Sequence, residues 1–385
     1  MITRIRQSLA WVKRLSTNPD LRFSRPLLLF QSDDWGRAGV RDRAGWEELQ
    51  ASGLKLGEEP YDFYSLETAE DLQALSEVLR RHRDSAGRSP SVVMNFITAN
   101  VDFEASLRAN GGPISLKPLT EGLPRSWNRP QLFEAYRQGI RDRVFFPALH
   151  GLTHFCNKAI SRALEADGER AQLVRKMWRA QTPYIHWRMP WIGYEYWDPE
   201  ETTRPQFLSF DDQRMAIRRA AEIYRALFGA DASSACAPGY RANSDTRKIW
   251  FEAGVRVAQN GPGRQAGPYV DEQGMLLTFR NVEMEPSIAG CELEDLMRQV
   301  ENCFVRRIPA VVSVHSINFH STLKDFRTPT LTLLDGFLAA VEKKWPDRLY
   351  VNDADLFEIA TKGVYFAENE NVSVTVTTVG EGSRA

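Results

Sequence analysis

The chain of 385 residues is long enough to form one large domain or two smaller ones. Its 43% of hydrophobic and 26% of charged residues are typical of a globular protein, and its formal net charge of −1 excludes a global field that would attract nucleic acid or an anionic membrane. The spacing of the four cysteines fits neither a zinc knuckle nor a disulfide framework, so we expect free thiols and a cytoplasmic location.

The N-terminal segment 1–21 is expected to form an amphipathic helix that packs on the main domain. It is basic, and its apolar residues fall close to helical spacing: Ile2, Ile5, Leu9, Val12 and Leu15. It lacks the uninterrupted apolar core of a secretion signal. Contact with a membrane surface is the alternative use of such a helix. No segment of the sequence approaches the length of a transmembrane span.

A short apolar run near the N-terminus leads into two adjacent carboxylates. Residues 27–30 are apolar, and Asp33, Asp34 and Trp35 follow after two residues. This pattern predicts a buried strand with both aspartates at its carboxyl end. Because neighbouring side chains of an extended segment point to opposite sides, the two can face different partners, one a metal and one a reacting water. An Asx turn that caps the next helix is the alternative explanation.

A pair of histidines follows another strand-like run, residues 144–148. His150 and His154 are four residues apart, and histidines with this spacing on a helical turn can converge on one ion. Two imidazoles and one carboxylate would make a three-ligand site with an open position for water. A purely structural role is the alternative for either histidine.

Expected strands and helices alternate along the rest of the chain. Helices are predicted at 43–51, 65–82, 131–143, 161–182, 211–228, 293–304 and 330–344, one ends at 254, and a last one begins at Asp353 or Asp355. In the helix at 65–82, Thr68 with Asp71 resembles a capping box. Strands are predicted at 91–100, 144–148, 234–240, 255–260, 275–282, 309–314 and 349–352. This alternation indicates an α/β fold. About seven to eight parallel strands without a glycine-rich dinucleotide fingerprint favour a deformed (β/α) barrel.

We expect the barrel to span residues 22–365 and a tail to span 366–385, in which the run from Val372 alternates like an edge strand. Two long insertions are predicted, near 104–130 and 183–206. The second holds seven aromatic residues between positions 184 and 197, counting His186. Aromatic faces suit the apolar faces of sugar rings, so Trp187 and Trp191, with Trp197, are expected to form one wall of a cleft. Packing of the insertion against the barrel is the alternative.

On the Asp-Asp and His-x-x-x-His motifs, the chain resembles the polysaccharide deacetylase family, carbohydrate esterase family four, as a divergent member. The resemblance implies that Asp33 is the general base and that Asp34, His150 and His154 bind a divalent ion, with Zn²⁺ as the expected metal. The run 310–314 ends at His315 and resembles a later motif of the family, which implies that His315 protonates the leaving group.

The sequence departs from the motifs of that family. The usual first motif, Thr-Phe-Asp-Asp-Gly, reads Gln31-Ser32-Asp33-Asp34-Trp35-Gly36 here. The Arg-x-Pro motif falls at Cys236-Ala237-Pro238, so the arginine that normally pairs with the catalytic aspartate is missing, and Arg241 and Arg37 are the candidates to replace it. We also expect Trp35, Tyr240 and Arg241 to contact substrate. Family members are often exported, so the expected cytoplasmic location is a further departure.

The resemblance implies a metal-dependent deacetylase that hydrolyses N-acetyl or O-acetyl groups on a saccharide or polysaccharide. One alternative is a glycoside hydrolase on a related barrel, in which Asp33 acts with Glu283 or Glu285. A second is a non-haem iron oxygenase, which also uses two histidines and a carboxylate. A third is a catalytically silent saccharide-binding protein.

Overall fold

The computed structural model describes residues 19–109, 114–262, 267–367 and 371–378. Most of the predicted N-terminal helix, residues 1–18, and the end of the tail from residue 379 lie outside this range. Within the described part of the chain, none of the helices has both the length and the apolar character needed to cross a membrane.

The main sheet is almost entirely parallel, which confirms the predicted α/β class. Its strands follow the order β11-β12-β2-β3-β6-β7-β8-β10-β9, and β13 pairs with β2. Only the β9–β10 pair is antiparallel among these described strands. The strands are β2 (Leu27–Trp35), β3 (Val92–Ile97), β6 (Phe145–Gly151), β7 (Ser234–Cys236), β8 (Val257–Asn260), β9 (Tyr269–Val270), β10 (Leu276–Phe279), β11 (Val282–Glu283), β12 (Ala310–His315) and β13 (Leu349–Tyr350).

The sheet curls, and the short segment between β10 and β11 connects its two sides. β10 pairs with β8, and β11, which begins only three residues after β10 ends, pairs with β12. Between them, the backbone N–H of Arg280 donates to Asn260 on one side, and that of Asn281 donates to Val311 on the other. This curled sheet is the predicted barrel in its deformed form.

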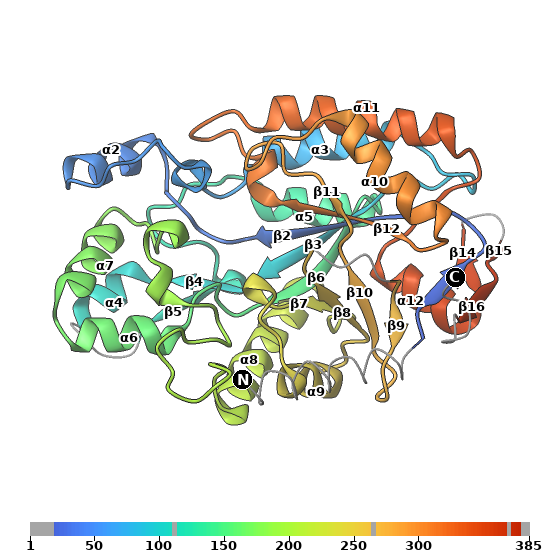
Figure 1. Cartoon of the computed structure of the whole chain (residues 1–385). Helices are drawn as coiled ribbons and strands as arrows, with labels where there is room; N and C mark the ends of the chain where they lie inside the picture. The colour runs from blue at the N-terminus through green and yellow to red at the C-terminus, as the bar shows by residue number, and fades with distance from the viewer. Residues whose placement is uncertain (1–18, 110–113, 263–266, 368–370, 379–385) are drawn as a thin grey trace, which may run out of the picture.

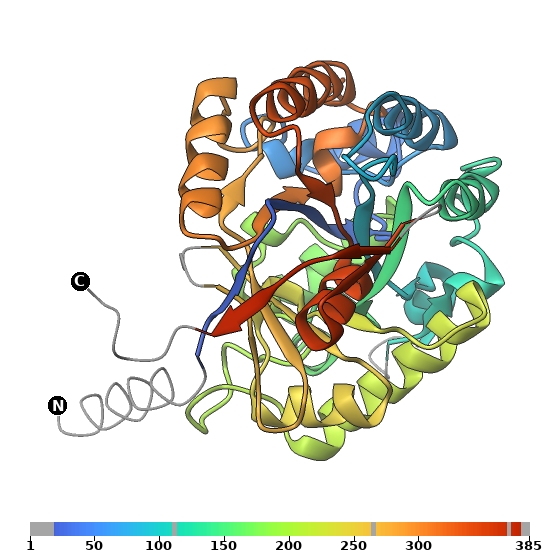
Figure 2. The same ribbon diagram turned by 90° about the vertical axis from the view of Figure 1, so that its right-hand side faces the viewer.

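Helices surround the sheet, as Figure 2 shows in an end-on view. They are α2 (Arg43–Ala51), α3 (Ala69–Arg81), α4 (Phe103–Ala109), α5 (Leu132–Arg141), α6 (Asn157–Glu165), α7 (Glu169–Arg179), α8 (Phe210–Phe228), α9 (Ser244–Glu252), α10 (Leu293–Val305), α11 (Arg327–Lys344) and α12 (Asp353–Lys362). α3 begins with the predicted capping box of Thr68 and Asp71. The single helix predicted over 161–182 is wrong, because the chain turns at Asp167, with a φ of 48°, between α6 and α7.

The two ends of the barrel differ. α12 (red in Figure 2) crosses the end where the strands begin, and its first residue is bonded to Gln31 of β2. The carboxyl ends of β2, β3 and β6 point the other way, toward α2, α4, α6 and α7 (Figure 1). β2 is buried along its whole length, so its side chains reach the mouth from inside the core. In barrels of this kind, chemistry is carried out at that mouth.

The insertions and the tail contain regular structure. The first insertion holds α4, β5 (Leu116–Pro118), which pairs with β4 (Ala99–Val101), and η2 (Leu119–Glu121); the second holds η3 (His186–Arg188) and η4 (Pro190–Ile192). The tail forms β14 (Val364–Phe366) with β15 (Asn371–Ser373), and β16 (Val376–Thr378), which pairs with β1 (Leu21–Phe23). Three more short turns are η1 (Pro60–Phe63), η5 (Pro238–Tyr240) and η6 (Ser316–Phe319).

Candidate active site

The two adjacent aspartates lie on a bulge at the end of β2. The pairing of β2 with β3 jumps from Ser32 to Trp35, so Asp33 and Asp34 are left out of this ladder, although Asp33 stays in register with His315 of β12 on the other side. Asp34 has a left-handed backbone, with a φ of 75°. We predicted that a plain extended strand would point the two carboxylates to opposite sides. In the structure, the bulge turns them toward different partners instead.

Hydrogen bonds from neighbouring elements fix this bulge. The Tyr64 hydroxyl donates to the carbonyl oxygen of Asp34 at 2.8 Å, and the Ser316 hydroxyl donates to the same oxygen at 3.3 Å. The backbone N–H of Gly36 donates to the buried carboxylate of Glu67 at 2.8 Å. Gly36 itself has a φ of 72°, which side-chain-bearing residues rarely adopt. The aspartates are therefore held in place by the fold.

Asp34 faces the histidine pair. Its Oδ1 lies 3.7 Å from Nε2 of His150 and 3.2 Å from Nε2 of His154. The prediction that both histidines share a helical turn is wrong: His150 lies in β6, which ends at Gly151, and His154 comes three residues after this glycine, whose φ of 131° turns the chain. Glu195 fixes that turn, because its carboxylate accepts from the backbone N–H groups of residues 152 and 153. The three side chains still converge, as the spacing predicts.

The convergent atoms fit a metal ion. Asp34 Oδ1 and His150 Nε2 are buried and have no hydrogen-bond partner. His150 Nδ1 lies 2.9 Å from the carbonyl oxygen of Cys236, which can only accept, so this nitrogen carries the proton and Nε2 keeps a free lone pair. Such a second bond is usual for metal-binding histidines.

The charge state of these groups also suits a metal. Burial raises the pKa of Asp34, but Arg37, 2.7 Å from its Oδ2, and His154 hold that pKa well below the usual range. Burial lowers the pKa of His154 well below its ordinary value, so the imidazole is neutral near pH 7. An ionised carboxylate and neutral imidazoles are the forms that bind metals. The Arg37 guanidinium is itself held between the rings of Tyr64 and Tyr184.

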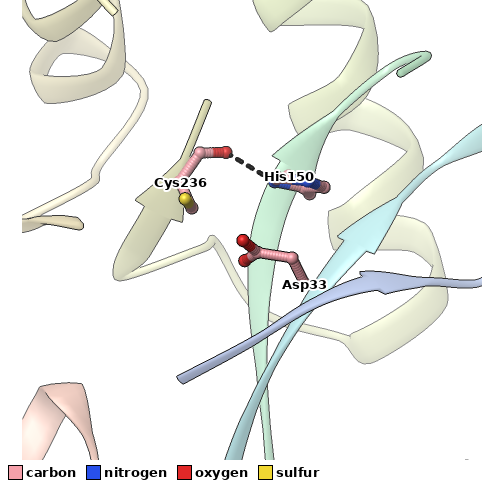
Figure 3. A group of neighbouring side chains, drawn as sticks. All are labelled: Asp33, His150 and Cys236. Carbon is pink, nitrogen blue, oxygen red and sulfur yellow. Dashed lines mark hydrogen bonds between the residues drawn. The ribbon is translucent and has the colours of Figure 1, made fainter. Parts of the chain in front are cut away.

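A second cluster, shown in Figure 3, does not make an equivalent site. Ligand atoms of Asp33, His150 and Cys236 also lie within 4.8 Å of one another. The Arg280 guanidinium already binds both oxygens of Asp33 and lies 3.8 Å from the Cys236 sulfur. Burial and the nearby Asp33 carboxylate raise the pKa of the Cys236 thiol well above its usual value, which disfavours a thiolate ligand. The Asp34 cluster therefore fits an ion better.

Asp33 is an ionised carboxylate in a buried ion pair. Arg280 Nη1 lies 2.8 Å from its Oδ2, and Arg280 Nη2 lies 2.5 Å from its Oδ1. Burial would raise the pKa of Asp33, but the charge of Arg280, with His150 and His315, lowers it below the usual value. Asn95 also donates to Oδ1, at 2.7 Å. Asp33 is thus oriented and charged near neutral pH.

His315 ends β12 next to Asp33. Its Nε2 lies 3.8 Å from Asp33 Oδ2, and its Nδ1 lies 2.7 Å from Glu285 Oε1. Burial lowers the pKa of His315, but the charge and hydrogen bond of Glu285 outweigh this and raise it to about 9. The imidazole is therefore protonated at neutral pH and can donate a proton from Nε2.

The two aspartates and the three histidines line one cavity of about 470 Å³, and these residues are Asp33, Asp34, His150, His154 and His315. One part of its wall is aromatic and consists of Tyr61, His186, Trp187, Tyr194 and Tyr240. Another part is formed by the segment after β11 and by α10, with Glu283, Glu285, Ile288, Ala289, Gly290, Cys291, Asp295 and Gln299. Burial lowers the pKa of His186 to about 4, so the aromatic part carries no charge at neutral pH. Trp187 is 60% exposed.

Several residues expected to contact substrate lie outside the cavity wall. Trp35 is fully buried, stacks on Phe319 and donates to Ser32. Trp191 packs against the core with Arg170 over its ring. These positions correct the prediction for both, because apolar packing holds the rings away from the mouth.

The remaining predictions for this region have different outcomes. Arg241 lies over the ring of Trp197, and neither of the two belongs to the cavity wall. The prediction that Arg241 or Arg37 replaces the missing arginine is wrong, since Arg280 pairs with Asp33 and Arg37 with Asp34. Trp187 and Tyr240 do line the cavity.

Sequence reasoning missed Arg280 and the pairing of Glu285 with His315. A signal for Arg280 was present, because it is a charged residue inside an apolar strand-like run, and buried charges need partners. Asn95 in the middle of β3 is a polar residue of the same kind. Nothing local to the sequence identifies which partner each one has.

No family model and no curated protein matches this chain. Solved structures do match. A probable polysaccharide deacetylase from Pseudomonas aeruginosa is 12% identical, with 88% of this chain and 92% of that chain covered and a TM-score of 0.46. A putative polysaccharide deacetylase from Mycobacterium smegmatis is 12% identical, with 87% and 89% covered and a TM-score of 0.45.

A CE4 family pseudoenzyme from Bacillus anthracis is 10% identical, with 87% of this chain and 66% of that chain covered and a TM-score of 0.39. Two of these similar structures are thus described as a probable and a putative polysaccharide deacetylase, and the third as a pseudoenzyme. At such identities and TM-scores, the likeness decides neither fold nor activity, and both are argued from the geometry of this chain.

Proposed function

We propose that the protein is a metal-dependent hydrolase that removes N-acetyl or O-acetyl groups from a saccharide. One observation carries the proposal: unpartnered ligand atoms of Asp34 and His150 converge with His154, beside an Asp33 that is paired with Arg280 and a His315 that is paired with Glu285. A carboxylate base and an imidazolium acid next to a three-ligand metal site are the groups that amide or ester hydrolysis needs.

The residues take separate roles in this proposal. Asp34, His150 and His154 hold the ion, and their oxygen and nitrogen ligands fit Zn²⁺. The ion supplies Lewis acidity toward an acyl carbonyl and toward water. Asp33 accepts the proton of the attacking water, and His315 donates a proton to the departing nitrogen or oxygen. Asp33 Oδ2 and His315 Nε2 lie 3.8 Å apart, which supports roles as base and acid on the same reacting group.

The cavity wall supports a saccharide as substrate. Its volume of about 470 Å³ lies within the range of small-molecule sites. Trp187 and Tyr61 have ring centroids 6.0 Å apart, and Trp187 exposes most of its surface. Such rings can pack on the C–H faces of a sugar. The four free thiols suit a reducing compartment, so we place the proposed activity in the cytoplasm.

A glycoside hydrolase is less well supported. That chemistry needs a second carboxylate that is free to flank the glycosidic bond. Glu285 is bonded to His315 and to Asn318, and Glu283 is an exposed residue at the rim. Glu285 is therefore already engaged, and Glu283, although it lines the cavity, is exposed to solvent at its rim.

Acetate release from N- and O-acetylated mono- and oligosaccharides tests the proposal. Purified protein is assayed as isolated, after treatment with a chelator, and after addition of Zn²⁺, with bound metal measured in parallel. We expect release that the chelator abolishes and zinc restores. New reducing ends without acetate would indicate a glycoside hydrolase, and saccharide binding without either product would indicate a silent binding protein.

A further inference from the structure

A buried network of polar side chains connects Asp33 with the opposite end of the barrel. Its far end is Asp353, the first residue of α12, which is 0% exposed. Asp353 does not line the cavity and has no part in the roles proposed above. A buried carboxylate without an adjacent cation is costly unless hydrogen bonds satisfy it. Its partners therefore indicate what it does.

Three donors meet the Asp353 carboxylate. Gln31 Nε2 lies 2.8 Å from Oδ1, Gln259 Nε2 lies 2.8 Å from Oδ2, and the Ser234 hydroxyl donates to Oδ2. Burial raises the pKa of Asp353, and these hydrogen bonds offset part of that effect. Because an ionised carboxylate only accepts, each amide must turn its nitrogen toward it.

This contact fixes the orientation of Gln259. With Nε2 toward Asp353, the other end of the amide, Oε1, faces Asn95 Nδ2 at 2.8 Å and Arg280 Nη2 at 3.2 Å. Arg280 can only donate, so it holds the amide in the same orientation from the other side. Gln259 Nε2 also donates to Asn95 Oδ1 at 2.9 Å.

Asn95 is oriented in turn. Its Oδ1 accepts from Gln259, so its Nδ2 is left to donate to Gln259 Oε1 and to Asp33 Oδ1, the latter at 2.7 Å. Asp33 Oδ1 thus receives hydrogen bonds from Asn95 and Arg280, and both donors contact the Gln259 amide. Each link in this chain is buried.

We propose that Asp353 is a positioning residue for Asp33, acting through Gln259 and Asn95. Together with Arg280, its carboxylate sets the direction of the Gln259 amide and, through it, that of Asn95, so that Asn95 turns its Nδ2 donor and not its oxygen toward Asp33. The proposal rests on the proposed role of Asp33 as the base. It adds that the floor of the barrel, at the end away from the mouth, orients the reacting carboxylate.

Asp353→Asn tests this link with little change in volume. The asparagine side chain has a single carbonyl oxygen, which cannot accept from all three donors, Gln31, Gln259 and Ser234. Its NH₂ group then faces one of these donors. We expect kcat for acetate release to fall by about 10- to 100-fold, as for a misplaced reacting group, with KM and bound zinc unchanged. Asp355→Asn is the matched control, since Asp355 lies in the same helical turn but bonds Arg88 and caps α12. It should leave kcat within about twofold of wild type.

Combination with Asn95→Ala tests the route. If Asp353 acts through Asn95, the double variant Asp353→Asn/Asn95→Ala should be no slower than Asn95→Ala alone. The proposal would be overturned if the effects of Asp353→Asn and Asn95→Ala on kcat multiplied in the double variant. Equal effects of Asp353→Asn and Asp355→Asn on kcat would also overturn it. If Asp353→Asn does not fold, Ser234→Ala removes one donor to the same carboxylate and should lower kcat with KM unchanged; an unchanged kcat would overturn it too.

A readout without substrate separates this inference from the proposed function. In urea unfolding, the midpoint shift of the double variant should be smaller than the sum of the two single shifts, because both changes break one network. Additive shifts would contradict the link whatever the protein hydrolyses. If the variants show coupled shifts but the wild-type protein releases no acetate, only the proposed function is refuted.

Discussion

Arg280 binds both carboxylate oxygens of Asp33, although it follows a different strand from the one at which the family motif would place an arginine. Arg280 follows β10, whereas the motif position is Cys236 at the end of β7. The two side chains are in contact, with 3.8 Å between Arg280 Nη2 and the Cys236 sulfur. The small cysteine therefore leaves room for the guanidinium of Arg280, which comes from the end of β10. Asp33 thus still pairs with an arginine.

Replacement of Arg280 by methionine should destabilise the fold strongly. It leaves the buried Asp33 charge without its cation, and loss of one partner of a buried pair costs about 3–5 kcal/mol. Urea unfolding of the two proteins measures the difference. Arg225→Met is the control, because Arg225 pairs with Asp231 at the exposed surface, where such pairs contribute about 0–1 kcal/mol. Equal losses for both variants would show that the Asp33 pair is not desolvated.

Glu285→Gln should change how activity and stability depend on pH. Burial lowers the pKa of His315, and Glu285 raises it to about 9, above the unfolded value of 6.5. The raised pKa contributes stability that is complete below pH 6.5 and is lost as the pH rises through about 9. Without the Glu285 charge, burial dominates and the pKa falls.

The expected result for Glu285→Gln is therefore a basic limb of the kcat/KM profile at lower pH, by about one unit or more. Unfolding free energies of the variant should also decline less between pH 6.5 and 9 than those of wild type. Glu283→Gln is the control, since Glu283 is an exposed rim residue without a bond to His315. A shared basic limb in all three proteins would assign that limb to another group.

Much of the fold followed from the sequence, because buried strands and amphipathic helices leave clear local patterns. β2, α3, α8 and β12 lie within one to four residues of their predicted ends, and the capping box of α3 is present as predicted. The break between α6 and α7 was missed because apolar positions continue across it. The dipeptide Asp167-Gly168, which is typical of turns, was the sequence signal for it.

The site was predictable only where its residues are close in sequence. Asp33 with Asp34 and His150 with His154 form recognisable motifs, and their convergence was expected. Arg280 and Glu285 act on groups that are 247 and 30 residues away, so their partners depend on how the barrel closes. Trp35 and Trp191 were assigned to substrate by their neighbours in sequence, but packing of the core decides where aromatic rings point.

Trp187→Ala should weaken saccharide binding with little loss of stability. The ring lines the cavity and is 60% exposed, so its removal mainly takes away a surface for a sugar, by about 1 kcal/mol or roughly fivefold in Kd. Trp191→Ala should lower stability and leave saccharide binding unchanged, because Trp191 packs against the core outside the cavity. Isothermal titration with an acetylated oligosaccharide and thermal unfolding measure the two effects. Equal Kd values for wild type and Trp187→Ala would mean that the aromatic wall serves packing only.

The adjacent aspartates should have separable roles, because the bulge of β2 turns Asp34 to the histidines and Asp33 to Arg280. Asp34→Ala removes one of three proposed ligands and should abolish both bound metal and activity. Asp33→Asn keeps the volume and cannot accept the proton of water, so it should retain metal while turnover falls by about 10²–10⁴. Metal stoichiometry, measured beside acetate release, distinguishes the two. Metal lost from Asp33→Asn and kept by Asp34→Ala would mean that the ion lies with Asp33, His150 and Cys236; metal and activity kept by both would exclude the deacetylase mechanism.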